Sequence, residues 1–214
     1  MAKNKFHHEE ILRGKDAIAR FGQVRVVICG AGAIGSNLVD NLARQGFKLI
    51  CLIDMDRVDE HNINTQTYEE ADIGALKVNA CQTHVYRTVG VEIEIVSKKL
   101  EAKNVKKLLK DADLVVDGFD NTEARRLVAE HCKQEKIPCL HAGLHAEYAE
   151  VVWNESYTVP QEDPEGDVCD YPLARNLILI AVAMATEEIV NFVLGKKERR
   201  NLSFTLKDLK IGAY

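Results

Sequence analysis

The stretch "VRVVICGAGAIGSNLVDNLARQG", residues 24–46, decides the fold. It opens on an apolar run typical of a buried strand and continues with apolar side chains at helical spacing, which stop at Gly46. Between the two segments, Gly30, Gly32 and Gly35 complete the pattern G-x-G-x-x-G. Glycines in this context allow a tight turn, a close approach of backbone to phosphate, and close packing of helix on strand. The stretch therefore predicts a strand–turn–helix unit that binds a nucleotide.

Strand-like and helix-like segments alternate along the rest of the chain. Such alternation predicts an α/β fold, with a Rossmann-like, mostly parallel sheet covered by helices on both faces. An antiparallel extension is expected at the C-terminal end. We expect strands at residues 24–30, 47–54, 91–100, 112–119, 137–145, 146–154 and 202–206, the last as an edge strand, and helices at 7–21, 36–45, 74–88, 102–110, 122–135 and 173–194.

The whole chain, residues 1–214, is expected to form one domain. Its parts are an N-terminal helical segment (1–22), a nucleotide-binding part (23–136) and a C-terminal part (137–214). The C-terminal part contains an acidic loop over residues 155–172, and its long apolar helix is expected to end at Gly195.

Composition excludes several classes of function. Lys and Arg number 28 against 33 Asp and Glu, a net charge of −5, and no basic stripe or basic amphipathic helix indicates nucleic acid or a membrane surface. The N-terminus lacks the apolar core of a signal peptide, and the longest apolar run, residues 177–185, is too short to span a bilayer, so a cytoplasmic location is expected. No C-x-x-C pair exists, and His141 and His145 fall in a strand-like run, so no zinc site is expected.

Polar side chains follow the second and fourth expected strands. Asp54, nineteen positions after Gly35, is placed to hold a ribose, which by default suggests an NAD-linked dehydrogenase. Against that, 214 residues leave little room for a substrate region, and a dinucleotide gives no role to the polar residues after Asp54. Asp117, Asp120 and Asn121 also fall at the carboxyl edge of the sheet, where ligands bind. Because Mg²⁺ takes one or two carboxylates together with phosphate oxygens, this edge suits a nucleoside triphosphate with its metal.

At these residues the chain resembles the ThiF/MoeB/HesA family, the adenylating enzymes related to ubiquitin activation. The resemblance rests on the glycine-rich stretch and, in order, on "LIDMDRVDEHNINTQ", "DIGALKV", "DGFDNTEARRLV" and "AMATEEIVNFVLG". It implies that ATP and Mg²⁺ bind at the glycine turn and that a carboxylate is converted to an acyl-adenylate with release of pyrophosphate. The implied acceptor is the C-terminal glycine of a ubiquitin-like or sulfur-carrier protein.

The resemblance also implies a homodimer, with helix 173–194 in its interface, and a set of site residues. The nucleotide-binding set is Gly30, Gly32, Ile34, Gly35, Asp54, Asp56, Asn62, Gln66, Lys77 and Asn121; the catalytic set is Lys77, Asp120 and Arg125; Asp120 is also the expected Mg²⁺ ligand.

Some positions depart from the family pattern. Thr65 stands where the family has a phosphate-contacting arginine. His8, with Arg13 nearby, falls about where the family's N-terminal helix lends an arginine to the partner subunit's ATP. Cys169 is the candidate thioester nucleophile, although the flanking Asp167 and Asp170 favour the unreactive thiol.

Three alternatives stay open at this point. The first is that the chain adenylylates a small-molecule carboxylate in place of a protein C-terminus. The second is that it is a nucleotide-binding scaffold without activity, and the third is that it is an NAD(P)-dependent oxidoreductase.

Overall fold

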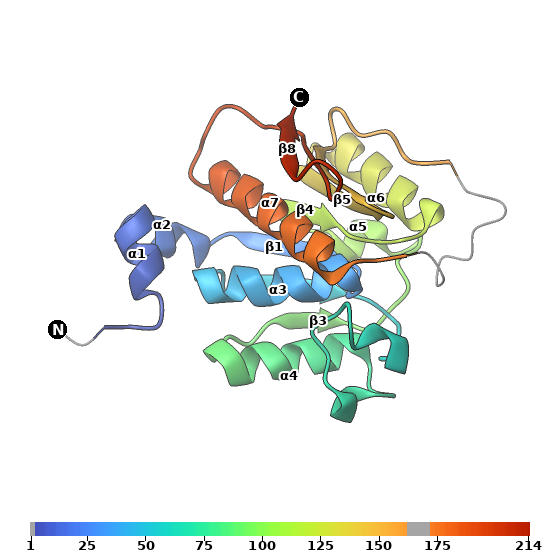
Figure 1. Cartoon of the computed structure of the whole chain (residues 1–214), viewed down its shortest axis with the longest axis horizontal. Coiled ribbons are helices and arrows are strands. Elements are labelled where there is room, and N and C mark those ends of the chain that lie inside the picture. The colour runs from blue at the N-terminus through green and yellow to red at the C-terminus, as the bar shows by residue number, and fades with distance from the viewer. Residues whose placement is uncertain (1–2, 162–171) are drawn as a thin grey trace.

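The computed structural model describes residues 3–161 and 172–214. Within these residues, eight strands form one sheet in the order β3-β2-β1-β4-β5-β6-β7-β8 (Figure 1). The strands are β1 (Arg25–Cys29), β2 (Leu49–Ile53), β3 (Glu94–Val96), β4 (Leu114–Asp117), β5 (Cys139–His145), β6 (Tyr148–Trp153), β7 (Leu202–Thr205) and β8 (Lys210–Ala213).

The strand pairing in the sheet changes from parallel to antiparallel at β5. Strands β3, β2, β1, β4 and β5 pair in parallel, and β5 to β8 pair antiparallel. The expected fold class, a mostly parallel Rossmann-like sheet with an antiparallel C-terminal extension, is confirmed. Because the carboxyl ends of the parallel strands meet at one edge, the loops that follow β1, β2 and β4 come together there.

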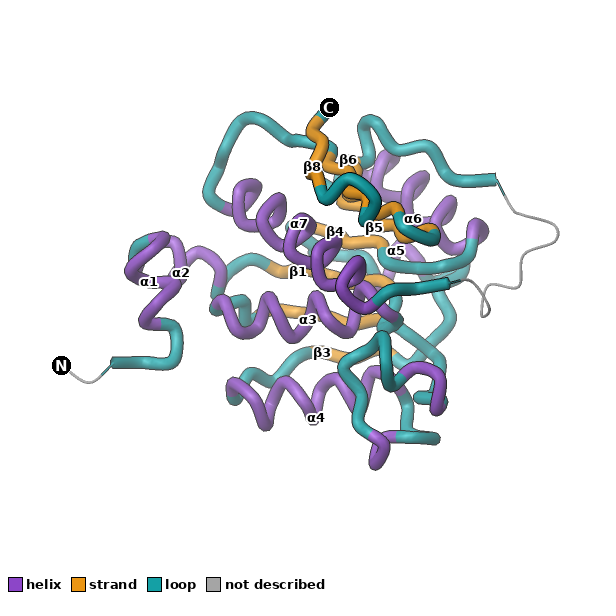
Figure 2. Tube along the Cα trace, in the orientation of Figure 1, coloured by secondary structure: helices purple, strands orange, loops and turns teal. Residues whose placement is uncertain are grey.

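Helices cover both faces of the sheet. Helices α3, α4 and α7 run side by side across the near face in Figure 2, and α5 and α6 lie behind the strands. The helices are α1 (His7–Arg13), α2 (Lys15–Phe21), α3 (Ala33–Gln45), α4 (Lys77–Val89), α5 (Val105–Leu108), α6 (Thr122–Glu135) and α7 (Arg175–Val193), with two 3-10 turns, η1 (Glu60–Asn62) and η2 (Glu70–Asp72).

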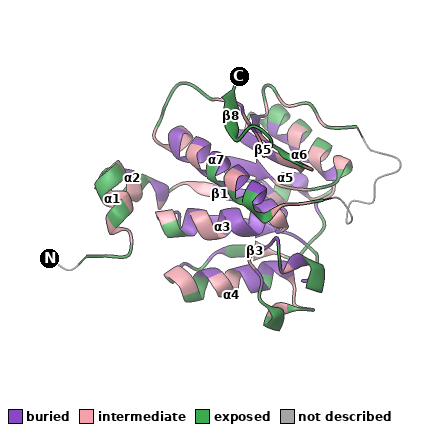
Figure 3. Cartoon of the chain, in the orientation of Figure 1, coloured by how far each residue is buried: buried purple, intermediate pink, exposed green. Residues whose placement is uncertain are grey.

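Two apolar cores follow from the alternation of side chains along the strands. Val26 and Ile28 of β1 pack with α3, α4 and α7, whereas Val27 and Cys29 pack with α5 and α6 on the other face. Both faces are therefore buried, which explains why the central strands read as continuous apolar runs. Figure 3 shows the result, with buried strands and an exposed β8 at the end of the sheet.

The structure corrects three expected elements. The helix expected at 7–21 is two helices, because Gly14 has a φ of 89°, which interrupts the helical backbone. Helix α3 begins at Ala33, before the expected start at Ser36. Strand β7 is not the edge strand, because β8 pairs with its outer side.

Helix α7 is long and apolar enough, by length and composition alone, to cross a membrane, a test that the core helix of a soluble protein also passes. Here most of its apolar window is buried, and the helix packs on α3, β5 and β6. It ends at Val193, and Gly195 follows with a φ of 74°, the left-handed conformation expected after a helix.

The glycine turn between β1 and α3 brings two backbone segments into close approach. A Cβ atom on Gly35 would lie 1.8 Å from the carbonyl oxygen of Gly30. Gly30 has a φ of 95°, where a side chain would add strain. Gly32 differs, because a Cβ there would meet nothing within 4 Å. Gly30 and Gly35 thus serve the fold, and Gly32 leaves open space above the turn.

Substitution separates these two roles. Gly35→Ala should lower the free energy of unfolding by about 3 kcal/mol, the upper end of the usual cost of overpacking, because two backbone segments must move apart. Gly32→Ala is the matched control and should unfold at a urea midpoint close to that of the wild type. Equal midpoints for Gly35→Ala and the wild type in urea denaturation would contradict this account of the turn.

Candidate nucleotide-binding site

The N-terminus of α3 is open at the carboxyl edge of the sheet. Gly32 is its cap residue and provides no capping side chain, and among the described residues no backbone carbonyl accepts from the N–H groups of Ala33, Ile34 or Gly35. These free donors and the positive end of the helix dipole favour an anion such as a phosphate. The open space above Gly32 lets that anion approach the backbone.

Asp54 fixes the glycine turn to the end of β2. Its Oδ2 accepts from the N–H of Ala31 at 2.6 Å, and its Oδ1 accepts from the N–H of Asp56 at 2.7 Å. Burial raises the pKa of Asp54, and the two N–H donors and nearby Lys77 partly offset that rise. Each carboxylate oxygen accepts more than one hydrogen bond, so Asp54 can hold the turn and still receive a ribose hydroxyl.

Lys77 supplies a buried positive charge at this edge. Its ammonium lies 3.6 Å from the carboxylate of Asp56, and its backbone N–H donates to the Asp56 carbonyl at 2.9 Å. The Asp56 side chain is 56% exposed, so water screens this ion pair and leaves the lysine available to a more strongly charged anion. The structure therefore brings Lys77, Asp54 and Asp56 together, as the sequence predicts.

The segment of residues 62–66 buries most of its polar side chains. The Oδ1 of Asn62 accepts from the backbone N–H of Asp59 at 2.9 Å as part of a capping box. Its Nδ2 donates to no described residue and is available to a ligand. Thr65 is buried, and its carbonyl accepts from Asn37 Nδ2 at 3.0 Å. Gln66 is also buried, and its Oε1 has no partner among the described residues.

Gln66 lines a groove of about 820 Å³ between α3, α4 and α7. Arg175, at the start of α7, donates to the carbonyl of Asn64 at 3.4 Å and lines the same groove. A guanidinium thus reaches the 62–66 segment from α7, although position 65 itself carries none.

Asp120 and Asn121 follow β4, beside the glycine turn. A Cβ on Gly30 would lie 3.0 Å from the carbonyl oxygen of Gly118, which shows how closely the two turns approach. Asn121 is the cap of α6, and its Oδ1 accepts from the N–H of Ala124 at 2.9 Å. Asp120 is exposed, and no side chain of residues 3–161 or 172–214 pairs with its carboxylate.

Arg125 is placed behind this turn rather than in the open site. Its Nη1 donates to the hydroxyl of Tyr157 at 3.1 Å and its Nη2 to the carbonyl of Ala142 at 3.0 Å. It also lies 3.6 Å from the carboxylate of Asp117, which is fully buried. These contacts assign Arg125 a supporting position, and its expected direct part in catalysis stays a prediction.

The sequence weighs His141 only as a zinc ligand or a pocket-lining residue and does not predict its place in this cluster. Its Nδ1 lies 2.8 Å from Asp117 Oδ2, and the two residues face each other in the β4–β5 register. A signal exists in the sequence, because Asp117 ends an otherwise apolar strand and His141 is a polar residue in the apolar first half of β5.

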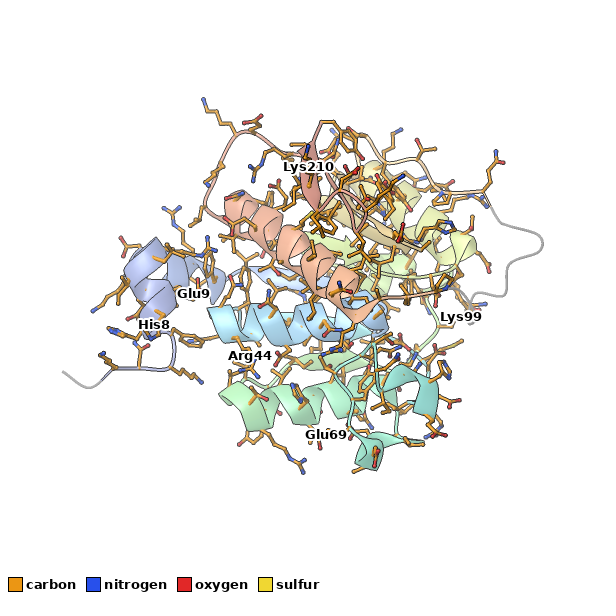
Figure 4. The ribbon with its side chains drawn as sticks, in the orientation of Figure 1. His8, Glu9, Arg44, Glu69, Lys99 and Lys210 are labelled. Atoms are coloured by element: carbon orange, nitrogen blue, oxygen red, sulfur yellow. The ribbon has the colours of Figure 1, made fainter. Side chains whose placement is uncertain are left out.

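His8 lies at the opposite end of the sheet from this site. Figure 4 shows it on α1, which precedes the N-terminal end of β1. Arg13 on the same helix pairs with Glu187 of α7 at 2.7 Å. Neither side chain reaches the glycine turn of its own chain. Cys169 lies outside the described residues; the five described cysteines are buried, free thiols.

The residues of this edge fit a nucleotide with Mg²⁺. In the described parts of the chain, no three His, Cys, Asp or Glu side chains converge to hold a metal ion by themselves. Mg²⁺ bound with a triphosphate needs only one or two protein carboxylates, because phosphate and water supply its other ligands. The exposed carboxylate of Asp120, beside the open N-terminus of α3, satisfies that requirement.

Fold and site together are those expected of a nucleotide-binding α/β protein, with a candidate anion site at a helix N-terminus. The model of the ThiF family matches residues 7–210, and the chain belongs to that family. The resemblance found in the sequence is thereby confirmed.

Individual relatives match over a smaller part of the chain. It is 29% identical over 134 residues to the SAMP-activating enzyme E1 of Haloferax volcanii, covering 62% of this chain and 50% of that protein. It is 28% identical over 139 residues to the sulfur carrier protein ThiS adenylyltransferase of Bacillus subtilis, covering 63% of this chain and 41% of that protein. The chain thus spans half or less of the length of these relatives.

Solved structures confirm the fold. The crystal structure of E. coli MccB with ATP superimposes with a TM-score of 0.84 at 17% identity, over 100% of this chain and 71% of that one.

The role of Asp54 in holding the glycine turn, through its hydrogen bonds to the N–H groups of Ala31 and Asp56, can be tested by substitution. Asp54→Asn should lower the free energy of unfolding by about 1–3 kcal/mol, because an amide offers one acceptor oxygen to two N–H groups and leaves one of them unpaired. Asp208→Asn, in the exposed β7–β8 turn, is the matched control and should stay within about 0.5 kcal/mol of the wild type. If urea denaturation gives both variants the same midpoint, Asp54 does not hold the turn.

Proposed function

We propose that this protein uses ATP and Mg²⁺ to adenylylate a carboxylate, giving an acyl-adenylate and pyrophosphate. The observation that carries this proposal is the open N-terminus of α3, bordered by Asp54, Lys77 and Asp120 at one edge of the sheet. The activity named for the Bacillus relative, an adenylyltransferase, supports it.

The residue types suit this reaction. A carboxylate oxygen attacks the α-phosphorus, a phosphorus–oxygen bond forms, and the bond to the leaving pyrophosphate breaks. The attacking carboxylate is already ionised at neutral pH, so no side chain needs to act as a base. The free N–H groups of α3 and the Lys77 ammonium would bind the phosphates, and Asp54 would orient the ribose. Asp120 would hold Mg²⁺, whose charge offsets that of the phosphate oxygens.

We further propose that the acceptor is the C-terminal glycine of a ubiquitin-like or sulfur-carrier protein. The Bacillus relative is named for the sulfur carrier protein ThiS, and the Haloferax relative is named a SAMP-activating enzyme. A cytoplasmic location suits such an acceptor.

ATP–pyrophosphate exchange tests the proposal. Wild-type protein with Mg²⁺ and a carrier protein ending in glycine should exchange label, and EDTA should stop exchange until excess Mg²⁺ restores it. Asp120→Ala should reduce exchange about 100- to 1000-fold, the scale of removing one well-placed electrostatic group. Glu123→Ala, an exposed acid on the next turn, is the control and should exchange like the wild type.

Other outcomes separate the alternatives. Exchange with a small carboxylic acid but with no carrier protein would replace the proposed acceptor. ATP binding without exchange under any condition would indicate a scaffold. Tight NADH binding without ATP binding would contradict the proposed function, and unchanged exchange in Asp120→Ala would contradict the Mg²⁺ assignment.

We also propose a homodimer that buries the face formed by α3 and α7. Leu179 is 47% exposed in the middle of this face, beside the 820 Å³ groove, and Ala183 one turn later is exposed as well. A second copy would cover these apolar side chains and could bring its N-terminal helix toward this site, where its own chain does not place it.

Leu179→Glu should shift the protein from dimer to monomer in sedimentation-velocity measurements, because the interface would bury an unpaired charge. Leu209→Glu is the matched control, since Leu209 is 71% exposed in the β7–β8 turn, and this variant should sediment like the wild type. A wild-type monomer, or a Leu179→Glu dimer of unchanged affinity, would contradict the proposed interface.

A further inference from the structure

A buried polar cluster lies beneath the carboxyl edge, and apart from Arg125 its members have no assigned role in the proposed reaction. His141, on β5, is 1% exposed and stands at its centre. Asp117 faces it from β4, Arg125 approaches from α6, and Asn154 and Tyr157 approach from the segment after β6. Buried charged and polar groups are costly unless they are paired, so each contact constrains the charge that His141 carries.

The Nε2 atom of His141 must carry a hydrogen. It lies 2.8 Å from Asn154 Oδ1, and the Nδ2 of the same amide donates to the carbonyl of Ala129 at 3.1 Å. That carbonyl only accepts, so the amide cannot turn over without setting two acceptors against each other. Asn154 therefore presents its oxygen to the imidazole, and Nε2 donates. Cys139 Sγ, 3.5 Å from the same nitrogen, is compatible because a sulfur atom is a weak acceptor.

The Nδ1 atom of His141 must carry a hydrogen as well. It lies 2.8 Å from Asp117 Oδ2. Burial raises the pKa of Asp117, but Arg125, the His141 hydrogen bond and the Phe119 N–H outweigh burial and lower it overall. The ionised carboxylate only accepts, so Nδ1 donates to it. With both ring nitrogens donating, His141 is an imidazolium.

The ring of Tyr157 supports this charge state. It stacks on His141 with 3.6 Å between ring centroids and 6° between the planes. Burial raises the pKa of Tyr157, which keeps it a neutral phenol whose π face suits a cation. Its hydroxyl accepts from Arg125, so one side chain contacts both cations of the cluster.

The cluster also holds the turn that carries Asp120. Asp117 Oδ1 accepts from the backbone N–H of Phe119 at 3.1 Å, so the carboxylate that binds His141 also shapes residues 117–121. Arg125 donates to the carbonyl of Ala142, next to His141, and joins α6 to β5. A displacement of His141 therefore shifts the Asp117 carboxylate, and that carboxylate in turn shifts the backbone of residues 117–121.

We infer that His141 is held as an imidazolium and is a positioning residue, which through Asp117 sets the 117–121 turn and so the place of Asp120. This role rests on the proposed adenylylation for its effect on rate, whereas the charge state and the position of the turn do not depend on it.

Nitrogen-15 NMR of the unliganded protein tests the charge state directly. Long-range proton–nitrogen correlation, with His141 assigned by its loss in His141→Asn, should show both ring nitrogens protonated at neutral pH. One unprotonated ring nitrogen would overturn the inference.

Three substitutions test the positioning role. Asparagine at position 141 can place an amide N–H near the Nδ1 position and keep the donor to Asp117, glutamine can place one near Nε2, and leucine offers neither. The Phe119 amide should exchange hydrogen slowly in the wild type and His141→Asn, and faster in His141→Gln and His141→Leu. Equal protection in the three variants, or better protection in His141→Gln than in His141→Asn, would overturn the role.

Kinetics give a second readout. In ATP–pyrophosphate exchange, His141→Leu should lower kcat by about 100-fold with little change in the KM for ATP, because a displacement of about 1 Å near the reacting atoms has that effect. His141→Asn should retain more of kcat than His141→Leu, and His145→Asn, on the exposed end of β5, should match the wild type. A change confined to the KM, or equal kcat in the Asn and Leu variants, would count against positioning.

Failure of the wild type to exchange at all would overturn the proposed function instead. The NMR spectrum and the protection of the Phe119 amide would then still decide the role of His141.

Discussion

The contact between Gly35 and the carbonyl of Gly30 is the constraint on which the rest of the structure depends. A methyl group at Gly35 would overlap that oxygen, so only glycine lets α3 begin directly against the end of β1. The double acceptance of N–H groups by Asp54 then joins this turn to β2. The free N–H groups of α3 consequently point to the edge where β1, β2 and β4 end, and packing alone fixes the position of the candidate anion site.

The same physics decides how much of the fold could be predicted. Central strands buried on both faces give unbroken apolar runs, which are easy to recognise in the sequence. Asn121 is a typical N-cap residue and marks the start of α6, so the observed bounds, Thr122–Glu135, match the expected 122–135. The first turn of α3 has one large apolar residue, Ile34, among small residues, so it shows no apolar period and its start is hidden. Strand β8 is short and fully exposed, so it has no burial pattern to detect. Gly14 breaks the first helix through its backbone angle, and apolar spacing does not report that angle.

The position of a candidate site residue in the fold was predictable where it follows from the order of the strands. Asp54 follows β2, Asp120 follows β4 and Lys77 begins α4, so the topology places all three at the carboxyl edge of the sheet. The partners of a side chain are harder to predict when they come from distant parts of the chain. Arg125 is held by Ala142 and Tyr157, and neither contact can be inferred from spacing. Asn62 likewise uses its oxygen in a local cap, so only its Nδ2 is available to a ligand.

Other positive groups at the site limit the effect of having Thr65 where the family has an arginine. Electrostatic stabilisation of a transition state is most effective when donors are fixed in advance and need not reorganise. The N–H groups of α3 are fixed by the Gly30–Gly35 contact, and Lys77 is fixed at the start of α4 through its backbone bond to Asp56. Beneath them, Asp117 contacts Arg125 and His141, and with His141 held as the inferred imidazolium the three side chains carry a net positive charge below the edge. At low local dielectric such a charge acts over several ångströms without touching the phosphate. A threonine at position 65 therefore removes one cation, while the N–H groups of α3, Lys77 and the cluster beneath them still contribute positive potential at this edge.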